Sequence, residues 1–272
     1  MPDPGTLALM VLLLAVIGAF GGVIAGLLGV GGGIVLVPAF FYAFTVLGYS
    51  GPQLMQVCLA TSLATIIVTS VKSVRSHNKR GAVDWQILKG WAPWIAGGAV
   101  VGMIAASGLK SVVLQAIFGV LGLVVGLYLA FGRPQWRLGE TMPKGAGRGV
   151  TGAVIGFLSV LMGIGGGSFG VPLMTLYNVP IHRAVATAAG FGVTIALPSV
   201  IGFLFLGVEG APPWTVGAVN LPAFALVVAM TMVTTPWGVK LAHSMDAKPL
   251  RRVFAVFIMV MALNMLRKAL GY

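Results

Sequence analysis

The sequence predicts an all-α polytopic membrane protein made of two inverted-topology repeats, and three observations support this. First, 58% of the residues are hydrophobic and 8% are charged, whereas an ordinary soluble protein carries about 25% charged residues. Second, several apolar runs are long enough to cross a membrane, which takes about 20 helical residues. Third, one glycine-rich motif occurs twice.

The apolar runs predict the same series of helices in each half of the chain: one long, one short, then three long. The first repeat, residues 1–131, is expected to hold helices at 6–28, 34–47, 54–71, 87–107 and 112–131. Residues 6–28 lack the basic flank of a signal peptide and exceed its usual apolar length, so they are interpreted as a membrane helix. A polar cytoplasmic linker is predicted at 132–148.

The second repeat, residues 149–272, is expected to form one integrated membrane domain with the first. Its predicted helices are 149–164, 168–177, 184–206, 215–235 and 250–270. The repeat is most visible in the stretches GLLGVGGGIVLVP at 26–38 and LMGIGGGSFGVP at 161–172. Aligning Gly33 with Gly167 also aligns Pro38 with Pro172, and further along the chain Thr61 matches Thr187 with a different offset.

The distribution of positive charge predicts how the two halves lie in the membrane. Segments 72–89, 132–148, 177–183 and 239–252 contain most of the 17 basic residues. Since cytoplasmic loops accumulate Lys and Arg, these segments are placed inside and both termini outside. The halves then have opposite orientations, as in many secondary transporters. The net charge of +12 is thereby explained by topology, and no nucleic-acid partner is expected.

Each glycine run is predicted to interrupt the helices at membrane depth, which is tolerated only inside protein or beside a watery cavity. The short helix that follows presents free N–H groups and a positive dipole end, which together favour an anion. The predicted substrate-binding residues are Gly31, Gly32, Gly33, Thr61, Ser62, Gly165, Gly166, Gly167, Ser168 and Thr187. Pro38 and Pro172 are expected to reinforce the breaks, and His182 and Arg183 to form an anion-attracting cytoplasmic gate.

Simpler interpretations remain open for these residues. Scattered glycines such as Gly18 and Gly22 are expected to serve close helix packing. The hydroxyl groups could bond to their own helix backbone, and Arg183 could only set topology. GGSFG at 166–170 also fits the G-x-S-x-G pattern, which leaves an intramembrane serine hydrolase using Ser168 as an alternative.

Other ligand classes receive little support from the sequence. The chain has five carboxylates and three histidines, and none of the carboxylates falls within a predicted membrane segment, so a cation substrate or a metal site is not expected. The G-x-G-x-x-G pattern at 165–170 has no βαβ context, so no cofactor is expected. The single cysteine, Cys58, is interpreted as an apolar packing residue.

The two glycine motifs, with ATS at 60–62 and KRGAVDW at 79–85, resemble the TauE/SafE family of sulfite and organosulfonate exporters across essentially the whole chain. The resemblance implies export of a small sulfur-containing anion, such as sulfite or sulfoacetate, through a bacterial cytoplasmic membrane. A secondary transporter with alternating access is favoured, and an anion channel or uniporter is the alternative. Partners are then the anion and the lipid bilayer, with a homo-oligomer left open. Ser168 stands where the first motif has Ile34, which makes the two sides of the site chemically unequal.

Overall fold

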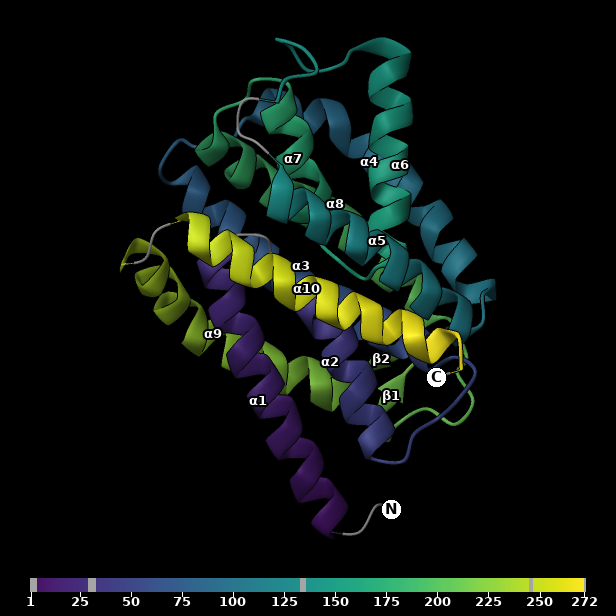
Figure 1. Cartoon of the computed structure of the whole chain (residues 1–272). Coiled ribbons are helices and arrows are strands. Elements are labelled where there is room, and N and C mark those ends of the chain that lie inside the picture. The colour runs from purple at the N-terminus through teal and green to yellow at the C-terminus, as the bar shows by residue number, and fades with distance from the viewer. Residues whose placement is uncertain (1–3, 29–32, 133–135, 245–246, 272) are drawn as a thin grey trace.

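A computed structural model describes residues 4–28, 33–132, 136–244 and 247–271, and it is almost entirely helical (Figure 1). In the first half the helices are α1 Pro4–Leu28, α2 Gly33–Val46, α3 Leu54–Asn78, α4 Trp85–Gly108 and α5 Ser111–Phe131. In the second half they are α6 Gly145–Leu161, α7 Gly167–Leu176, α8 Ile181–Leu204, α9 Leu221–Ser244 and α10 Ala247–Ala269. A small antiparallel hairpin, β1 Thr215–Val216 and β2 Val219–Asn220, precedes α9.

The all-α polytopic membrane fold predicted from the sequence is confirmed, and the inverted orientation of the repeats stays a prediction. Within the described ranges, six helices are long and apolar enough to cross a membrane: α3, α4, α5 and α8, together with Pro4–Ala25 of α1 and Leu221–Gly238 of α9. The predicted order of long and short helices is also found in both halves. Because the apolar runs are long and separated by charged or Pro-rich segments, hydropathy alone was enough to find them.

Several helix boundaries differ from the prediction, and α9 runs nine residues beyond its expected end, to Ser244. Helix α3 continues through Lys72 and Arg75 to Asn78, because basic side chains are favourable near a helix C-terminus and can extend toward water. Helix α6 begins at Gly145, inside the expected linker. Helix α9 begins at Leu221 and not near residue 215, because a tight hairpin with Gly217 at φ +59° occupies the preceding segment.

Helices α3 and α8 form the buried centre of the molecule. In their most apolar windows 78% and 61% of the residues are buried, compared with 28–39% for the other candidate spans. Around this centre α1 packs along α9, α6 along α4, and α5 along α10 (Figure 1). These pairs follow the repeat. Helix α1 corresponds to α6 and α9 to α4, so the α1–α9 pair is equivalent to the α6–α4 pair, and α5–α10 is equivalent to itself. The two halves therefore interlock.

Glycines permit the close approach of the outer helix pairs. A Cβ atom added at Gly18 would lie 2.9 Å from Val227 Cα of α9, and one at the aligned Gly152 would lie 2.9 Å from Trp94 Cβ of α4. Gly22 meets α9 one turn further along, where an added Cβ would lie 2.7 Å from Thr231 Cα. The packing interpretation of Gly18 and Gly22 is thereby supported, as expected for small residues between membrane helices.

Candidate functional site

The second glycine run ends α6 with a specific turn. Gly163 has φ +61°; its N–H donates to Val160 O (2.9 Å), and the Ile164 N–H donates to Ser159 O (2.9 Å). This pair of bonds is a Schellman motif, in which a left-handed glycine closes the helix C-terminus. Residues 162–168 are all buried. The predicted helix break is therefore present in the protein interior, with its carbonyl groups partly satisfied by the turn.

The short helices that follow the two motifs begin at aligned residues. Helix α2 starts at Gly33 and α7 at Gly167, the two glycines that the sequence repeat placed in register. Gly31 and Gly32, which were predicted to bind substrate, lie outside the described residues. The first N–H groups of α7, at Gly167 and Ser168, have no partner one turn earlier within their own helix, and the helix dipole makes this end positive.

The two breaks meet beside the middle of α3. A Cβ atom added at Gly33 would lie 3.0 Å from both Gly163 O and Ile164 Cα. The Ser62 hydroxyl donates to Gly163 O at 2.7 Å. Ile66, one turn after Ser62, lies against both breaks, with side-chain atoms 2.9 Å from the Cβ position of Gly33 and 3.3 Å from that of Gly165. The start of α2 thus lies against the buried turn between α6 and α7, and the Ser62 hydroxyl bonds to the same turn.

Gly166 has a packing role in addition to any role in binding. A Cβ atom here would collide with Phe191 Cβ and would lie 2.7 Å from Ala188 O, both on α8. Gly170 faces the Phe191 ring in the same way, with 2.8 Å between its Cβ position and Cδ2. The absence of side chains at these positions therefore lets the N-terminal turn of α7 lie directly on α8.

Thr61 and Thr187 make reciprocal contacts between the halves. Thr187 Oγ1 accepts a hydrogen bond from the Asp84 N–H (2.9 Å), immediately before α4. Thr61 Oγ1 accepts one from the Asn220 N–H (3.0 Å), immediately before α9. Both threonines are fully buried. Each hydroxyl oxygen therefore fixes the start of a helix from the other half, and substrate binding by these groups stays a prediction.

Pro38 and Pro172 lie inside their helices, at the sixth residue of α2 and of α7. Each helix continues beyond its proline, to Val46 and Leu176. Since proline lacks an N–H, the carbonyls of Ile34 and Ser168 lose their usual helical donors. The prolines therefore loosen the first turn after each break without ending the helix.

The two residues expected to form a gate lie at the exposed start of α8. Arg183 Nη2 is 3.0 Å from Asp84 Oδ2, with the Arg183 side chain 52% exposed. Asp84 also caps α4, because its Oδ1 accepts from the Ile87 N–H at 3.0 Å. The charge of Arg183 is therefore balanced by a carboxylate, which reduces its attraction for a free anion. His182 lies beside it and is exposed.

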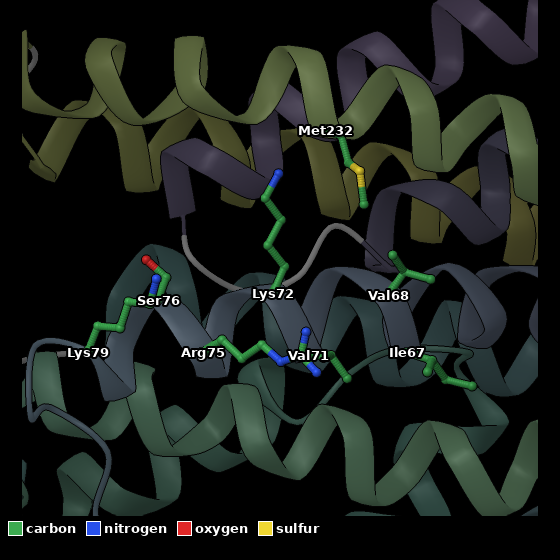
Figure 2. Close-up of a pocket in the computed structure, with 8 residues that line it drawn as sticks. All are labelled: Ile67, Val68, Val71, Lys72, Arg75, Ser76, Lys79 and Met232. Carbon is green, nitrogen blue, oxygen red and sulfur yellow. The ribbon is translucent and has the colours of Figure 1, made fainter.

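A cavity of about 630 Å³ lies between the C-terminal half of α3 and Met232 of α9. Lys72, Arg75 and Lys79 contribute to its wall (Figure 2). In the sequence, these cations indicated only the membrane topology. Their spacing of three and then four residues is typical of one helix face, which could have indicated a common site if α3 had been extended to Asn78.

The described residues offer little support for other chemistry. Among them, no cluster of three or more His, Cys, Asp or Glu side chains could hold a metal ion. The buried polar side chains in the same ranges carry hydroxyl or amide groups, as at Ser159, Gln115 and Ser168, and none is a carboxylate. Buried, uncharged donors of this kind suit an anion better than a cation.

Comparison with known proteins gives a consistent result over the whole chain. The sequence is 30% identical to a probable membrane transporter protein of Haemophilus influenzae, over 95% of this chain and 98% of that protein. It is 27% identical to one of Methanocaldococcus jannaschii, over 95% and 96% of the two chains. It is 32% identical to the probable membrane transporter protein YunE of Bacillus subtilis, over 77% and 83%. No solved structure gives a significant match.

The family comparison covers both repeats. A model described as the sulfite exporter TauE/SafE matches residues 14–265. That range includes both glycine motifs, the reciprocal threonines and the cavity along α3. The chain belongs to the TauE/SafE sulfite exporter family.

Proposed function

We propose that this membrane transporter is a secondary carrier that exports a small sulfur-containing oxyanion, such as sulfite or sulfoacetate, across the cytoplasmic membrane. The observation that carries the proposal is the buried contact between the start of α2 and the break that precedes α7, where the Gly33 Cβ position lies 3.0 Å from Gly163 O. Family membership agrees with transport, and the substrate class follows from the family's description.

The anion would be bound by uncharged donors. The N–H groups in the first turn of α7 and the Ser168 hydroxyl can donate to sulfonate or sulfite oxygens, assisted by the positive end of the helix dipole. Ser168 is 7% exposed, so water competes weakly for its hydroxyl, whereas the Ser62 hydroxyl already donates to Gly163 O. A site of this kind holds an anion without a fixed countercharge, which favours its release as well as its binding.

Alternating access is the movement that the architecture supports. Helix pairs α1–α9 and α6–α4 correspond to each other in the two halves, and α1 and α6 run in opposite directions in the view of Figure 1. Inverted repeats around a midplane site commonly work by alternating access, and because the two halves interlock, each moving unit would contain helices from both halves. The hydrogen bonds that Thr61 and Thr187 accept from the Asn220 and Asp84 N–H groups link the two halves.

The test is a flux screen with the purified protein in sealed proteoliposomes. Uptake of radiolabelled sulfite, thiosulfate, sulfate, sulfoacetate and acetate is compared with that of empty liposomes. We expect saturable uptake of at least one sulfur oxyanion, accelerated when the same anion is loaded inside the vesicles. Uptake equal to that of empty liposomes for every anion would contradict the proposal.

The same experiment separates the carrier from its alternatives. An anion channel would give flux that is not accelerated by anion on the opposite side. A hydrolase would need Ser168 as nucleophile, but in the described residues Ser168 forms no hydrogen bond with a histidine or carboxylate. The Ser168→Ala variant is expected to raise the KM for transport, whereas a hydrolase would lose turnover of its substrate and leave flux unchanged.

A further inference from the structure

The cavity between α3 and α9 extends along α3 from the break region to the charged end of the helix. Its wall begins at Ile67 and reaches Lys79, a distance of about 18 Å at the helical rise of 1.5 Å per residue. Ile67 directly follows Ile66, the residue that touches both breaks. The Ile67 end of the cavity therefore lies at the level of the proposed binding region along α3.

The open end of the cavity is positively charged. Lys72, Arg75 and Lys79 are exposed and come from successive turns of one helix, and Lys72 extends across the cavity (Figure 2). Within the described ranges none of the three forms an ion pair, and no carboxylate lines the wall. Clefts lined by charge of one sign concentrate ions of the opposite sign and accelerate their capture.

The corresponding helix pair in the other half, α8 and α4, lacks the row of three cations and packs tightly at two glycines. Aligning Thr61 with Thr187 places Pro198, Ile201 and Phe205 at the positions of Lys72, Arg75 and Lys79. There α8 packs directly on α4, with the Met103 side chain filling the space beside Gly202. Nearer the start of α8, the Cβ position of Gly190 lies 2.5 Å from Leu88 Cδ2 of α4. The two related interfaces thus differ in both packing and charge.

We propose that this cavity is an entry site that captures a small oxyanion from the aqueous phase and delivers it to the two helix starts. The proposal rests on the function proposed above and deepens it by naming where the anion first binds. Lys72 and Arg75 attract the charged oxygens, while Val71 and Met232 form an apolar wall that accommodates the uncharged part of a sulfonate or carboxylate. The α4–α8 interface is the counterpart of the α3–α9 interface in the other half, and it packs tightly at Gly190 and Gly202.

Neutral variants of the cavity test this site. Lys72→Gln and Arg75→Gln are each expected to raise the KM for anion uptake about 10-fold while leaving kcat unchanged, because lost attraction slows capture and not translocation. Arg80→Gln is the matched control, since Arg80 is exposed, follows Lys79 directly and is absent from the cavity wall. Lys72→Arg keeps the charge and should restore the wild-type KM. Wild-type KM values in both neutral variants would overturn the proposal.

Direct binding makes the result independent of transport. Calorimetric titration of the detergent-solubilised protein with sulfite or sulfoacetate should give a Kd that increases about 10-fold in Lys72→Gln and stays unchanged in Arg80→Gln. If wild type binds but transports nothing, the proposed function fails while the entry site stands. If it transports and Lys72→Gln binds as tightly as wild type, the entry site fails alone. Absence of binding to wild type would also contradict the entry site.

Phospholipid head groups carry the same oxyanion chemistry, so lipid is varied as well. The KM is measured in phosphatidylcholine liposomes with and without phosphatidylglycerol. A cavity open to the aqueous phase predicts the same ratio of variant to wild-type KM in both. A lipid-occupied cavity would raise the wild-type KM only when phosphatidylglycerol is present, and that result would overturn the assignment to a soluble anion.

Discussion

At the scale of single residues, Asp84 and Asn220 occupy equivalent places. Each accepts a hydrogen bond at its side-chain Oδ1 from the backbone N–H three residues later, in Ile87 and Ala223, at 3.0 Å. Each also donates its own N–H to a threonine of the other half. The chain thus uses aspartate in one half and asparagine in the other for the same capping function, which both residues perform well.

This equivalence predicts the response to substitution at Asp84. Asp84→Asn keeps the cap and removes only a half-exposed ion pair with Arg183, so the free energy of unfolding should fall by less than about 1 kcal/mol. Asp84→Ala also removes the cap and should cost about 1 kcal/mol more. Thermal unfolding of the solubilised protein would measure both. Equal losses in the two variants would contradict a capping role.

Gly163 combines a left-handed backbone with a crowded site. Gly163→Ala should lower stability by about 2 kcal/mol or more, because a Cβ costs about 1–2 kcal/mol at positive φ and would lie 3.0 Å from Leu59 Cα. The control is Gly81→Ala, where φ is +64° but nothing lies within 4 Å of the added atom. Its thermal midpoint should fall much less. A similar decrease in both variants would mean that crowding at the break is unimportant.

At the scale of helices, the sequence predicted existence and order well and boundaries less well. Hydropathy and the repeat predicted the starts of α2 and α7 correctly, because a glycine run destabilises a helix through its own backbone freedom and needs no distant contact to do so. The end of α3 was predicted too early, because Lys72 and Arg75 resemble loop residues until the aqueous cavity that accepts them is known. The start of α9 depends on a hairpin and on Asn220, and neither shows in apolar periodicity.

The reciprocal threonines couple helices that are distant in sequence. Thr61→Val leaves the buried Asn220 N–H without its acceptor and should cost about 1–3 kcal/mol. Thr187→Val should cost less, since its bond to Asp84 is only partly buried. Thr194→Val is the control, because its hydroxyl only donates to Gly190 O within α8. Chemical unfolding in detergent would rank the three. A Thr61→Val loss no larger than that of Thr194→Val would contradict the coupling.

At the scale of the whole molecule, the candidate site was only partly accessible from sequence. The alignment of the two motifs indicated that both breaks belong together, and the structure places Gly33 against Gly163. The hydrogen-bond partners of Thr61 and Thr187 lie more than a hundred residues away in the sequence, so no local sequence pattern predicts them. The cavity is likewise non-local, since its wall forms only when α9 lies beside α3.

The proposed inverted arrangement of the halves gives the last prediction. In a Cys58→Ala background, which removes the single cysteine, new cysteines are placed at three exposed positions as Arg80→Cys, Glu140→Cys and Glu209→Cys. The positive-inside rule places positions 80 and 140 in the cytoplasm, and the repeat places position 209 on the opposite face. A membrane-impermeant maleimide applied to intact cells should label only Glu209→Cys, and inside-out vesicles should label only the other two. Labelling of positions 80 and 209 from the same side would require that α4 to α8 cross the membrane differently, and the two halves would then not be inverted.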